Sequence, residues 1–288
     1  MRPSVFFAAW LAVQLVACGG KPLAPEPHWR AEAFAAEQEG ARRHARGDYE
    51  GAAKSFGEAE RRFVAIDDSS GAQRARRHQS TALLSAGHAE QALALLDTAS
   101  AGDIDVRRLR VQAFLALSQP HAASGELASA VALCVAPCSQ KVALQLLGGR
   151  VALMQTRPAE AIVLAETALS TLKGTPEERS ETAIESANAY RLLAEARLQT
   201  GEFALALKDA EQALTLDRKL ALPEKIARDW LLIGDIHRKT GAGSNVASGP
   251  AAISAYQHAR DIAAAAGLRT VVAAANTAIS HLSKEQNK

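Results

Sequence analysis

The sequence has few of the residues and motifs that enzymes and metalloproteins need at their sites. Its 288 residues include 3 cysteines and 8 histidines, and the histidines show no metal-binding spacing such as His-Glu-x-x-His. The sequence also lacks a phosphate-binding loop and a Gly-x-Ser-x-Gly turn. We therefore expect no catalytic residue, no metal ion and no other cofactor.

An excess of charge of one sign is missing as well. The chain has 33 basic and 31 acidic residues, which gives a formal net charge of +2. This balance does not mark a protein that binds nucleic acid or an anionic membrane surface. The arginine clusters between Arg30 and Arg110 are matched there by thirteen acidic residues against thirteen basic ones, and we interpret them mostly as solvated helix faces.

Proline is scarce, whereas alanine is abundant. The chain has 10 prolines, 63 alanines and an apolar fraction of 48%. Such a chain can bury a sizeable core, and its alanine content favours helix over strand. The composition therefore predicts an all-α protein.

The stretch from Tyr190 to Leu214 shows how these helices are organised. Its apolar residues follow helical spacing on both sides of a break at Thr200 and Gly201. Small alanine side chains at the expected crossing allow two helices to approach within about 8–10 Å. The stretch therefore predicts a helical hairpin, with its crossing alanines at positions 194, 206 and 213.

The turn of this hairpin recurs along the chain. Clear copies begin at Gly47, Gly87 and Arg157, and in each a second alanine follows the first by seven residues, giving the pairs 52 and 59, 92 and 99, and 161 and 168. This Gly-x-aromatic-x-x-Ala pattern resembles the tetratricopeptide repeat, whose unit is a pair of antiparallel helices. The resemblance implies a helical-hairpin solenoid that binds a protein partner.

Two further copies are weaker. One has Ala123 and Ala130, with its glycine displaced to Gly125, and the other begins with Trp230 and continues to His237. The first alanines of the six units are 40, 31, 38, 45 and 46 residues apart, whereas the family's unit has about 34 residues. We therefore predict about six helix pairs over residues 29–266, followed by a C-terminal capping helix and tail over 267–288.

The N-terminus differs from the rest of the chain. Residues 1–17 contain a short apolar run that ends in Leu15-Val16-Ala17, directly before Cys18. This pattern is typical of a signal peptide, and it resembles the bacterial lipoprotein cleavage box, in which the cysteine is acylated. By the family's sorting rule, Gly19 permits export to the outer membrane. The resemblance implies a lipid-anchored protein facing the periplasm, with residues 18–28 as lipidated cysteine and flexible tether.

The other two cysteines, Cys134 and Cys138, lie between two predicted helices. In an exported protein they are candidates for a disulfide, and the alternative is a pair of buried thiols. A metal site is disfavoured because two cysteines supply only half of a tetrahedral set.

The family resemblance also implies where a partner binds. In the family, the first helices of the pairs line a concave groove. Carrying these positions over predicts a polar, arginine-bearing groove suited to a carboxylate or an acidic peptide, unless several of these charges are merely solvated. The predicted groove residues are Arg74, Arg77, Asn188, Arg191, Glu195, Arg228, Asp235 and Arg238.

We expect a scaffold or adaptor in cell-envelope assembly, for example in secretin, outer-membrane or peptidoglycan machinery, without enzymatic activity and without nucleic acid as a partner. The alternative is an envelope enzyme or small-molecule-binding protein, which would need a pocket with convergent polar groups.

Overall fold

The computed structural model describes residues 28–98, 102–173, 180–241 and 248–286. Within these ranges the chain forms thirteen α-helices and no strand. The predicted signal peptide, Cys18, most of the tether, Ala99 and the end of the C-terminal tail lie outside the described residues. The all-α prediction is confirmed.

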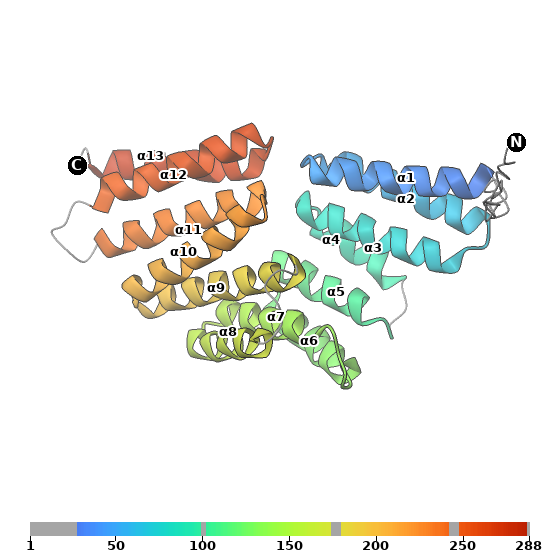
Figure 1. The fold of residues 1–288 in the computed structure, drawn as a ribbon, viewed down its shortest axis with the longest axis horizontal. Helices are drawn as coiled ribbons and strands as arrows, with labels where there is room; N and C mark the ends of the chain where they lie inside the picture. Colours follow the sequence, from blue (N-terminus) through green and yellow to red (C-terminus); the bar gives the residue numbers. More distant parts are fainter. Residues whose placement is uncertain (1–27, 99–101, 174–179, 242–247, 287–288) are drawn as a thin grey trace, which may run out of the picture.

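The helices follow one another along the chain as antiparallel neighbours (Figure 1). Their bounds are α1 His28–Ala45, α2 Tyr49–Ala65, α3 Ser69–Ser85, α4 Ala89–Asp97, α5 Ile104–Ala116, α6 Pro120–Leu133, α7 Lys141–Met154, α8 Pro158–Leu172, α9 Ser180–Thr200, α10 Phe203–Lys219, α11 Pro223–Gly241, α12 Ser248–Ala265 and α13 Arg269–Gln286.

The helices form two rows. Each odd-numbered helix from α3 to α11 packs against the next odd-numbered helix, whereas in the described part of the chain no two even-numbered helices pack in the same way. The more crowded row must lie on the concave side of a curved stack. The odd-numbered helices therefore line the inner surface, and the even-numbered helices form the outer surface.

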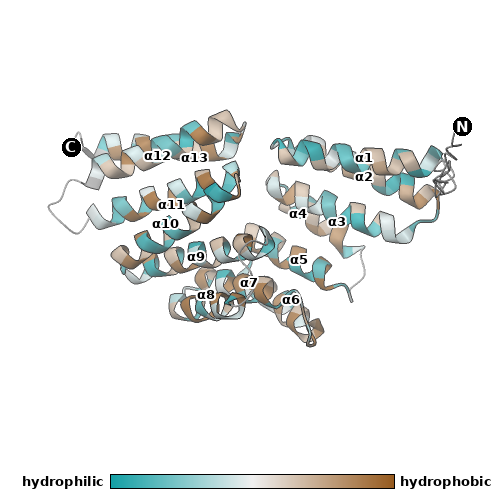
Figure 2. Ribbon diagram, viewed as in Figure 1, coloured by the Kyte–Doolittle hydropathy of each residue, from teal (hydrophilic) through white to brown (hydrophobic). Residues whose placement is uncertain are grey.

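The predicted crossing alanines hold the pairs together. The first alanine of every unit, from Ala52 to Ala252, is fully buried, and so are Ala59, Ala130, Ala168 and Ala213. Alternating teal and brown segments in Figure 2 show that the helices are amphipathic. In the described part of the chain, none of them combines the length and apolar character needed to span a membrane. The predicted solenoid of six helix pairs is confirmed.

In the first five pairs, the turns between the two helices share one backbone conformation. Gly47, Gly87 and Gly201 adopt positive φ angles of 78°, 85° and 82°, a region that glycine enters without strain. Ser118 and Thr156 occupy the same place in the third and fourth pairs, with φ angles of 56° and 57°. The prediction that Gly125 is the displaced turn glycine of the third unit is therefore wrong, because Ser118 makes this turn and Gly125 lies within α6.

Helix α13 ends the stack. Its Val271, Ala275 and Leu282 are buried against the preceding helices, while Asn276 and Thr277 are exposed. A polar outer face is what a terminal repeat needs to remain soluble. The predicted capping helix is confirmed.

The two ends of the stack contact each other. In Figure 1 the helices fan from α1 and α2 around to α12 and α13, and the tips of the first and last pairs point toward each other. The Tyr49 ring, at the start of α2, packs in one apolar cluster with Ala227, Leu268 and Val271. Its hydroxyl donates a hydrogen bond of 2.5 Å to the Glu224 carboxylate at the start of α11. The solenoid is thus closed by a contact between its ends.

Candidate functional site: the inner surface

Most of the predicted groove arginines are paired with acidic side chains of this chain. The Arg74 guanidinium donates two hydrogen bonds, of 2.7 and 2.9 Å, to Glu37 on the neighbouring inner helix. It also lies over the Phe34 and Phe63 rings, at 5.8 and 5.3 Å from their centroids. Arg77 donates to Asp103, the N-cap of α5, at 2.9 Å. These two arginines join successive units rather than pointing freely into solvent.

The predicted groove residues of α11 are engaged as well. Arg228 donates to Glu224 at 2.6 Å, one turn earlier on the same helix. Asp235 accepts a hydrogen bond of 2.7 Å from the Tyr256 hydroxyl and lies 3.5 Å from Arg238. Arg228 remains exposed, so of these charges it is the most accessible to a partner.

The arginine clusters were expected to be mostly solvated helix faces. This holds for Arg42 and Arg43, which are 54% and 42% exposed and pair with Glu39 of the same helix, but the structure contradicts it for the clusters of α3 and α5. Arg76 donates to Glu60 at 2.8 Å, and Arg110 pairs with Glu126 at 3.0 Å. Each pair connects two different helices, and each guanidinium is largely covered. The clusters therefore cross-link helices, because a long side chain can cover apolar surface and still reach a carboxylate.

Arg191 is buried rather than exposed in the groove, so its predicted place as a groove contact is wrong. It is 7% exposed, and its guanidinium pairs with Asp217 and with Asp229, the latter at 2.7 Å. Both carboxylates are fully buried. The guanidinium turns inward because burying two carboxylates without any cation would cost far more free energy than burying them together with Arg191.

This buried group has one cation for two acids. Asp217 Oδ1 and Asp229 Oδ2 are buried without a hydrogen-bond partner. Burial raises the pKa of Asp229 to about 7; the Arg191 charge opposes the rise, and neighbouring Asp217 adds to it. One proton shared by the two carboxyls would satisfy both bare oxygens and remove their repulsion. The group is thus a structural link between α9, α10 and α11 with a titratable proton.

Arg150, on α7, is not among the predicted groove residues. Its side chain is exposed and forms no hydrogen bond or ion pair with any residue that the structure describes. The surrounding helices displace water from its guanidinium and so lower its pKa, against the opposing effect of Glu195, while Arg191 and Arg228 lower it further. Arg150 is therefore a cation on the inner surface that has no carboxylate partner among the described residues and lies close to other cations.

Lys225 and Asn188 extend this region onto α11 and α9. Lys225 donates to Asn188 Oδ1 at 3.2 Å, and Arg191 donates to the same oxygen at 3.1 Å. Loss of hydration lowers the pKa of Lys225, and the charges of Arg191 and Arg150 lower it further. Three consecutive inner helices, α7, α9 and α11, thus bring polar and basic side chains together. We call Arg150, Asn188, Glu195, Lys225 and Arg228 the inner basic cluster.

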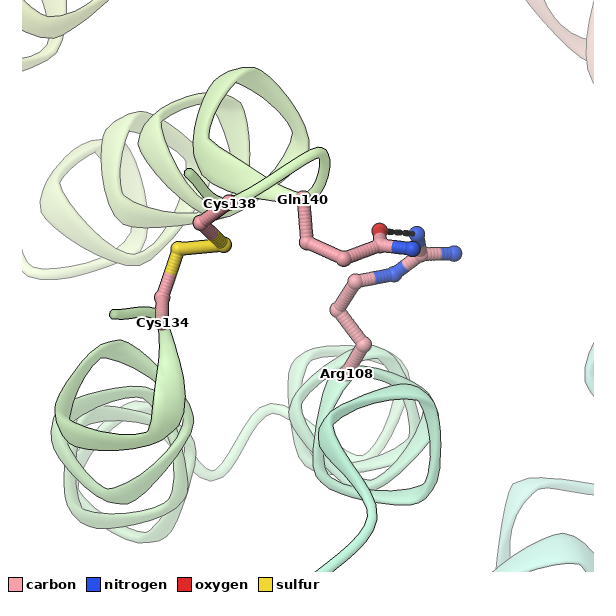
Figure 3. Close-up of a disulfide and its surroundings, with 4 residues drawn as sticks. All are labelled: Arg108, Cys134, Cys138 and Gln140. Atoms are coloured by element: carbon pink, nitrogen blue, oxygen red, sulfur yellow. Dashed lines mark hydrogen bonds between the residues drawn. A yellow bond between two sulfur atoms is a disulfide. The ribbon is translucent and has the colours of Figure 1, made fainter. Parts of the chain in front are cut away.

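The turn between α6 and α7 contains the two remaining cysteines. Cys134 and Cys138 form a disulfide in the structure, with their Cα atoms 5.4 Å apart. Figure 3 shows that Arg108 of the adjacent helix α5 reaches Gln140, just after the disulfide. The disulfide therefore closes the turn between α6 and α7 at the middle of the stack.

The described residues offer little for small-molecule chemistry. They contain no group of three or more metal-binding side chains. A hollow of about 370 Å³ near the first pair is lined by Arg30, Phe34, Ile66, Asp67 and Asp68, but it is open to solvent. The inner basic cluster is the stronger candidate site.

Comparisons with known proteins agree with the architecture. No protein-family model matches the chain, and no curated protein matches its sequence. The structure is similar to the apo form of RapI, with 13% sequence identity and a TM-score of 0.50 over 88% of this chain and 72% of that chain. It is also similar to the Cut9–Hcn1 hetero-tetramer of APC/C, with 18% identity and a TM-score of 0.55 over 84% of this chain and 46% of that chain. These similarities establish the fold, a tetratricopeptide-like solenoid.

Proposed function

We propose that this protein is a non-enzymatic scaffold that binds an acidic segment of a protein partner on its inner surface. The observation that carries the proposal is the unpaired Arg150 within the inner basic cluster. Elsewhere on the inner surface, Arg74 and Arg77 already have carboxylate partners. A partner carboxylate beside Arg150 would supply the anion that this region lacks.

The physical basis is the cost of crowding like charges. The Arg228 charge lowers the pKa of Arg150, the Arg150 charge lowers the pKa of Lys225, and Glu195 compensates at Arg150 only in part. Binding an anion there removes repulsion and adds charge-assisted hydrogen bonds. The neighbouring helices remove part of the hydration of Arg150, which lowers its pKa, so less water has to be displaced when an anion binds there.

Charge reversal at Arg150 tests the proposal. In a pull-down from detergent-solubilised membranes, the wild-type protein should recurrently recover one envelope protein. Arg150→Glu should recover at most about a tenth as much, because charge reversal replaces an attraction with a repulsion, and a tenfold loss of affinity corresponds to only about 1.4 kcal/mol. Partner recovery at the wild-type level by Arg150→Glu would exclude this site.

Arg61→Glu is the matched control. Arg61 is an exposed arginine on the outer helix α2, and it has no ion pair or hydrogen bond with the described residues. Its reversal changes the net charge by the same amount as Arg150→Glu, yet it should leave partner recovery unchanged. Circular dichroism spectra of both variants should match that of the wild type, because exposed substitutions usually change stability by only about ±0.5 kcal/mol.

We further propose that the scaffold is a lipoprotein of the outer membrane, facing the periplasm, and serves envelope assembly. The proposal is supported by the Leu15-Val16-Ala17-Cys18 sequence and by the Cys134–Cys138 disulfide, since disulfides persist in oxidising compartments. Radiolabelled palmitate should enter the wild-type protein but not Cys18→Ser. Label in neither protein would refute the lipid anchor without affecting the test of Arg150.

A further inference from the structure

The contact between the two ends of the solenoid is small compared with the helix packing that builds the rest of the stack. It consists of the Tyr49 side chain, the turn around Gly47 and the apolar side chains of α11 and α13. A methyl group built on Gly47 would lie 3.4 Å from both the Ala266 carbonyl oxygen and Leu268 Cδ2. The turn of the first pair therefore abuts the turn that precedes α13.

We call this contact the seam, and on its N-terminal side, side chains of α1 and α3 pack around Tyr49. The His44 ring packs edge-on against Tyr49, with centroids 5.0 Å apart, and its Nε2 lies 3.4 Å from Ser85 Oγ. Burial and the hydrogen bond to Glu224 raise the pKa of Tyr49, so the phenol keeps its proton and remains a donor. Tyr49 thus anchors the first pair to α11 by one hydrogen bond and one half-buried ring.

The seam is also connected to the inner basic cluster. The Glu224 carboxylate accepts hydrogen bonds from Tyr49 through Oε2 and from Arg228 through Oε1. A partner anion that takes Arg228 as its own counter-ion leaves Glu224 with less neutralised charge, which strengthens its hydrogen bond with Tyr49. Ligand binding and seam closure therefore act on the same carboxylate.

We propose that Tyr49 and Glu224 form a clasp that opens to admit the partner segment to the inner surface and closes around it. The seam is the weakest joint of the closed stack, because every other neighbouring pair of units is held by whole helix faces. A partner segment flanked by folded domains can be threaded through the closed ring only after this joint parts. This inference rests on the proposed function only in that the segment that enters is an acidic segment of a protein partner.

Distances across the seam test the clasp without any partner. Spin labels on Arg46→Cys and Arg269→Cys, two exposed positions on either side of the seam, report whether the ends are together. The full chain would carry Cys18→Ser, and thiol titration would verify that the Cys134–Cys138 disulfide is intact. The wild-type seam should give one short, narrow distance distribution, and Tyr49→Ala should give a longer and broader one.

Access to the inner surface provides the second readout. The Arg150→Cys variant, also in the Cys18→Ser background, would be treated with N-ethylmaleimide and with a maleimide attached to a large polyethylene glycol. Tyr49→Ala should raise the rate of the large reagent relative to the small one by about fivefold or more, which corresponds to about 1 kcal/mol of lost seam stability. A cysteine at Val163, which is 61% exposed on the outer helix α8, should show no such change.

Phe203→Ala is the matched control for the loss of the ring. Phe203 begins α10 at the same position of the repeat as Tyr49 in α2, but it packs inside the stack against the cluster around Ala206 and Ile233. Its truncation should lower the melting temperature and leave the label distances unchanged. Unchanged distances and reagent rates in Tyr49→Ala, or a broad distribution already in the wild type, would refute the clasp. Either result would leave the pull-down test of Arg150 standing.

Discussion

Arginines join successive inner helices in both halves of the molecule, but they do so in different environments. In the first half, Arg74 pairs with Glu37 where their side chains are 37% and 15% exposed. In the second half, Arg191 pairs with two aspartates that are fully buried. Water screens the first pair and is excluded from the second group. An arginine on an inner helix therefore forms a solvent-screened contact in one half of the molecule and a buried contact that the fold requires in the other.

The largest expected effect is at Arg191. Arg191→Glu would leave three acidic groups buried together without a cation, and we expect it to destabilise the fold by at least about 3–5 kcal/mol. The matched reversal Arg74→Glu should cost far less, because water can reach that pair. Urea unfolding followed by circular dichroism would measure both variants. Equal losses of stability would show that burial does not distinguish the two halves.

Overpacking a helix crossing should have the next largest effect. Ala206 is fully buried within α10, where it contributes to the core of the fifth pair. Ala206→Leu should cost about 1–3 kcal/mol, because the larger side chain forces two helices apart. A thermal melt compared with that of Ala204→Leu, at an exposed position on the same helix, would measure the effect. A wild-type melting temperature for Ala206→Leu would contradict the observed repeat register.

The buried acids predict an unusual pH dependence. The pKa of Asp229 is about 7 in the folded protein, above its ordinary value of 3.8 in the unfolded chain. Between these values the folded state binds more protons, so this group's stabilising contribution is present below about pH 4 and is lost as the pH rises through about 7. Stability should therefore fall with rising pH in this range, by on the order of 1–3 kcal/mol, since one pKa unit corresponds to about 1.36 kcal/mol.

Asp229→Asn isolates the contribution of the Asp229 carboxyl to the pH dependence of stability. The amide oxygen can still accept the hydrogen bond from Arg191, but the side chain no longer titrates. The difference in unfolding free energy between variant and wild type should shift in favour of the variant as the pH rises from about 5 to about 8. His44 and His78 titrate in both proteins and cancel in this difference. A difference that does not change with pH would show that Asp229 is ionised throughout.

The smallest effect is expected at Arg77. Its ion pair with Asp103 is partly exposed, at 29% and 23% for the two side chains. Arg77→Ala should therefore lower stability by only about 0.2–1 kcal/mol. The loss should shrink further in high salt, and unfolding curves at low and high ionic strength would measure it. A loss as large as that of Arg191→Glu would mean that the first half also relies on buried charge.

The repeat pattern was sufficient to predict the helix pairs, because buried alanines and turn residues are local features of a sequence. Ala206 could be assigned to a crossing from its distance to Gly201, and the structure confirms its burial. The third turn was misassigned because Ser118 adopts a left-handed conformation that its residue type does not announce. The pattern shows where glycine is used, but it does not show where another residue tolerates the same strain.

The inner surface was harder to predict, because side-chain pairing depends on residues far apart in the sequence. Nothing near Arg191 indicates that Asp217 and Asp229 will meet it, and so it was assigned to the groove. Arg150 was missed because groove positions were assigned only in the units with the clearest register, whereas its unit has Pro158 in place of the aromatic residue of the turn. Which arginines are free can be decided only after all acidic partners have been placed.

Closure of the stack by Tyr49 also affects how the molecule unfolds. In an open array of repeats, stability is set by nearest neighbours, and the terminal units fray first because each has only one. Here Tyr49 and Glu224 connect residues 175 positions apart, so the first unit gains a second neighbour. No unit then has only one neighbour, so the first unit is no longer expected to fray first. While the contact holds, the amide protons of α1 and α2 should exchange as slowly as those of interior helices.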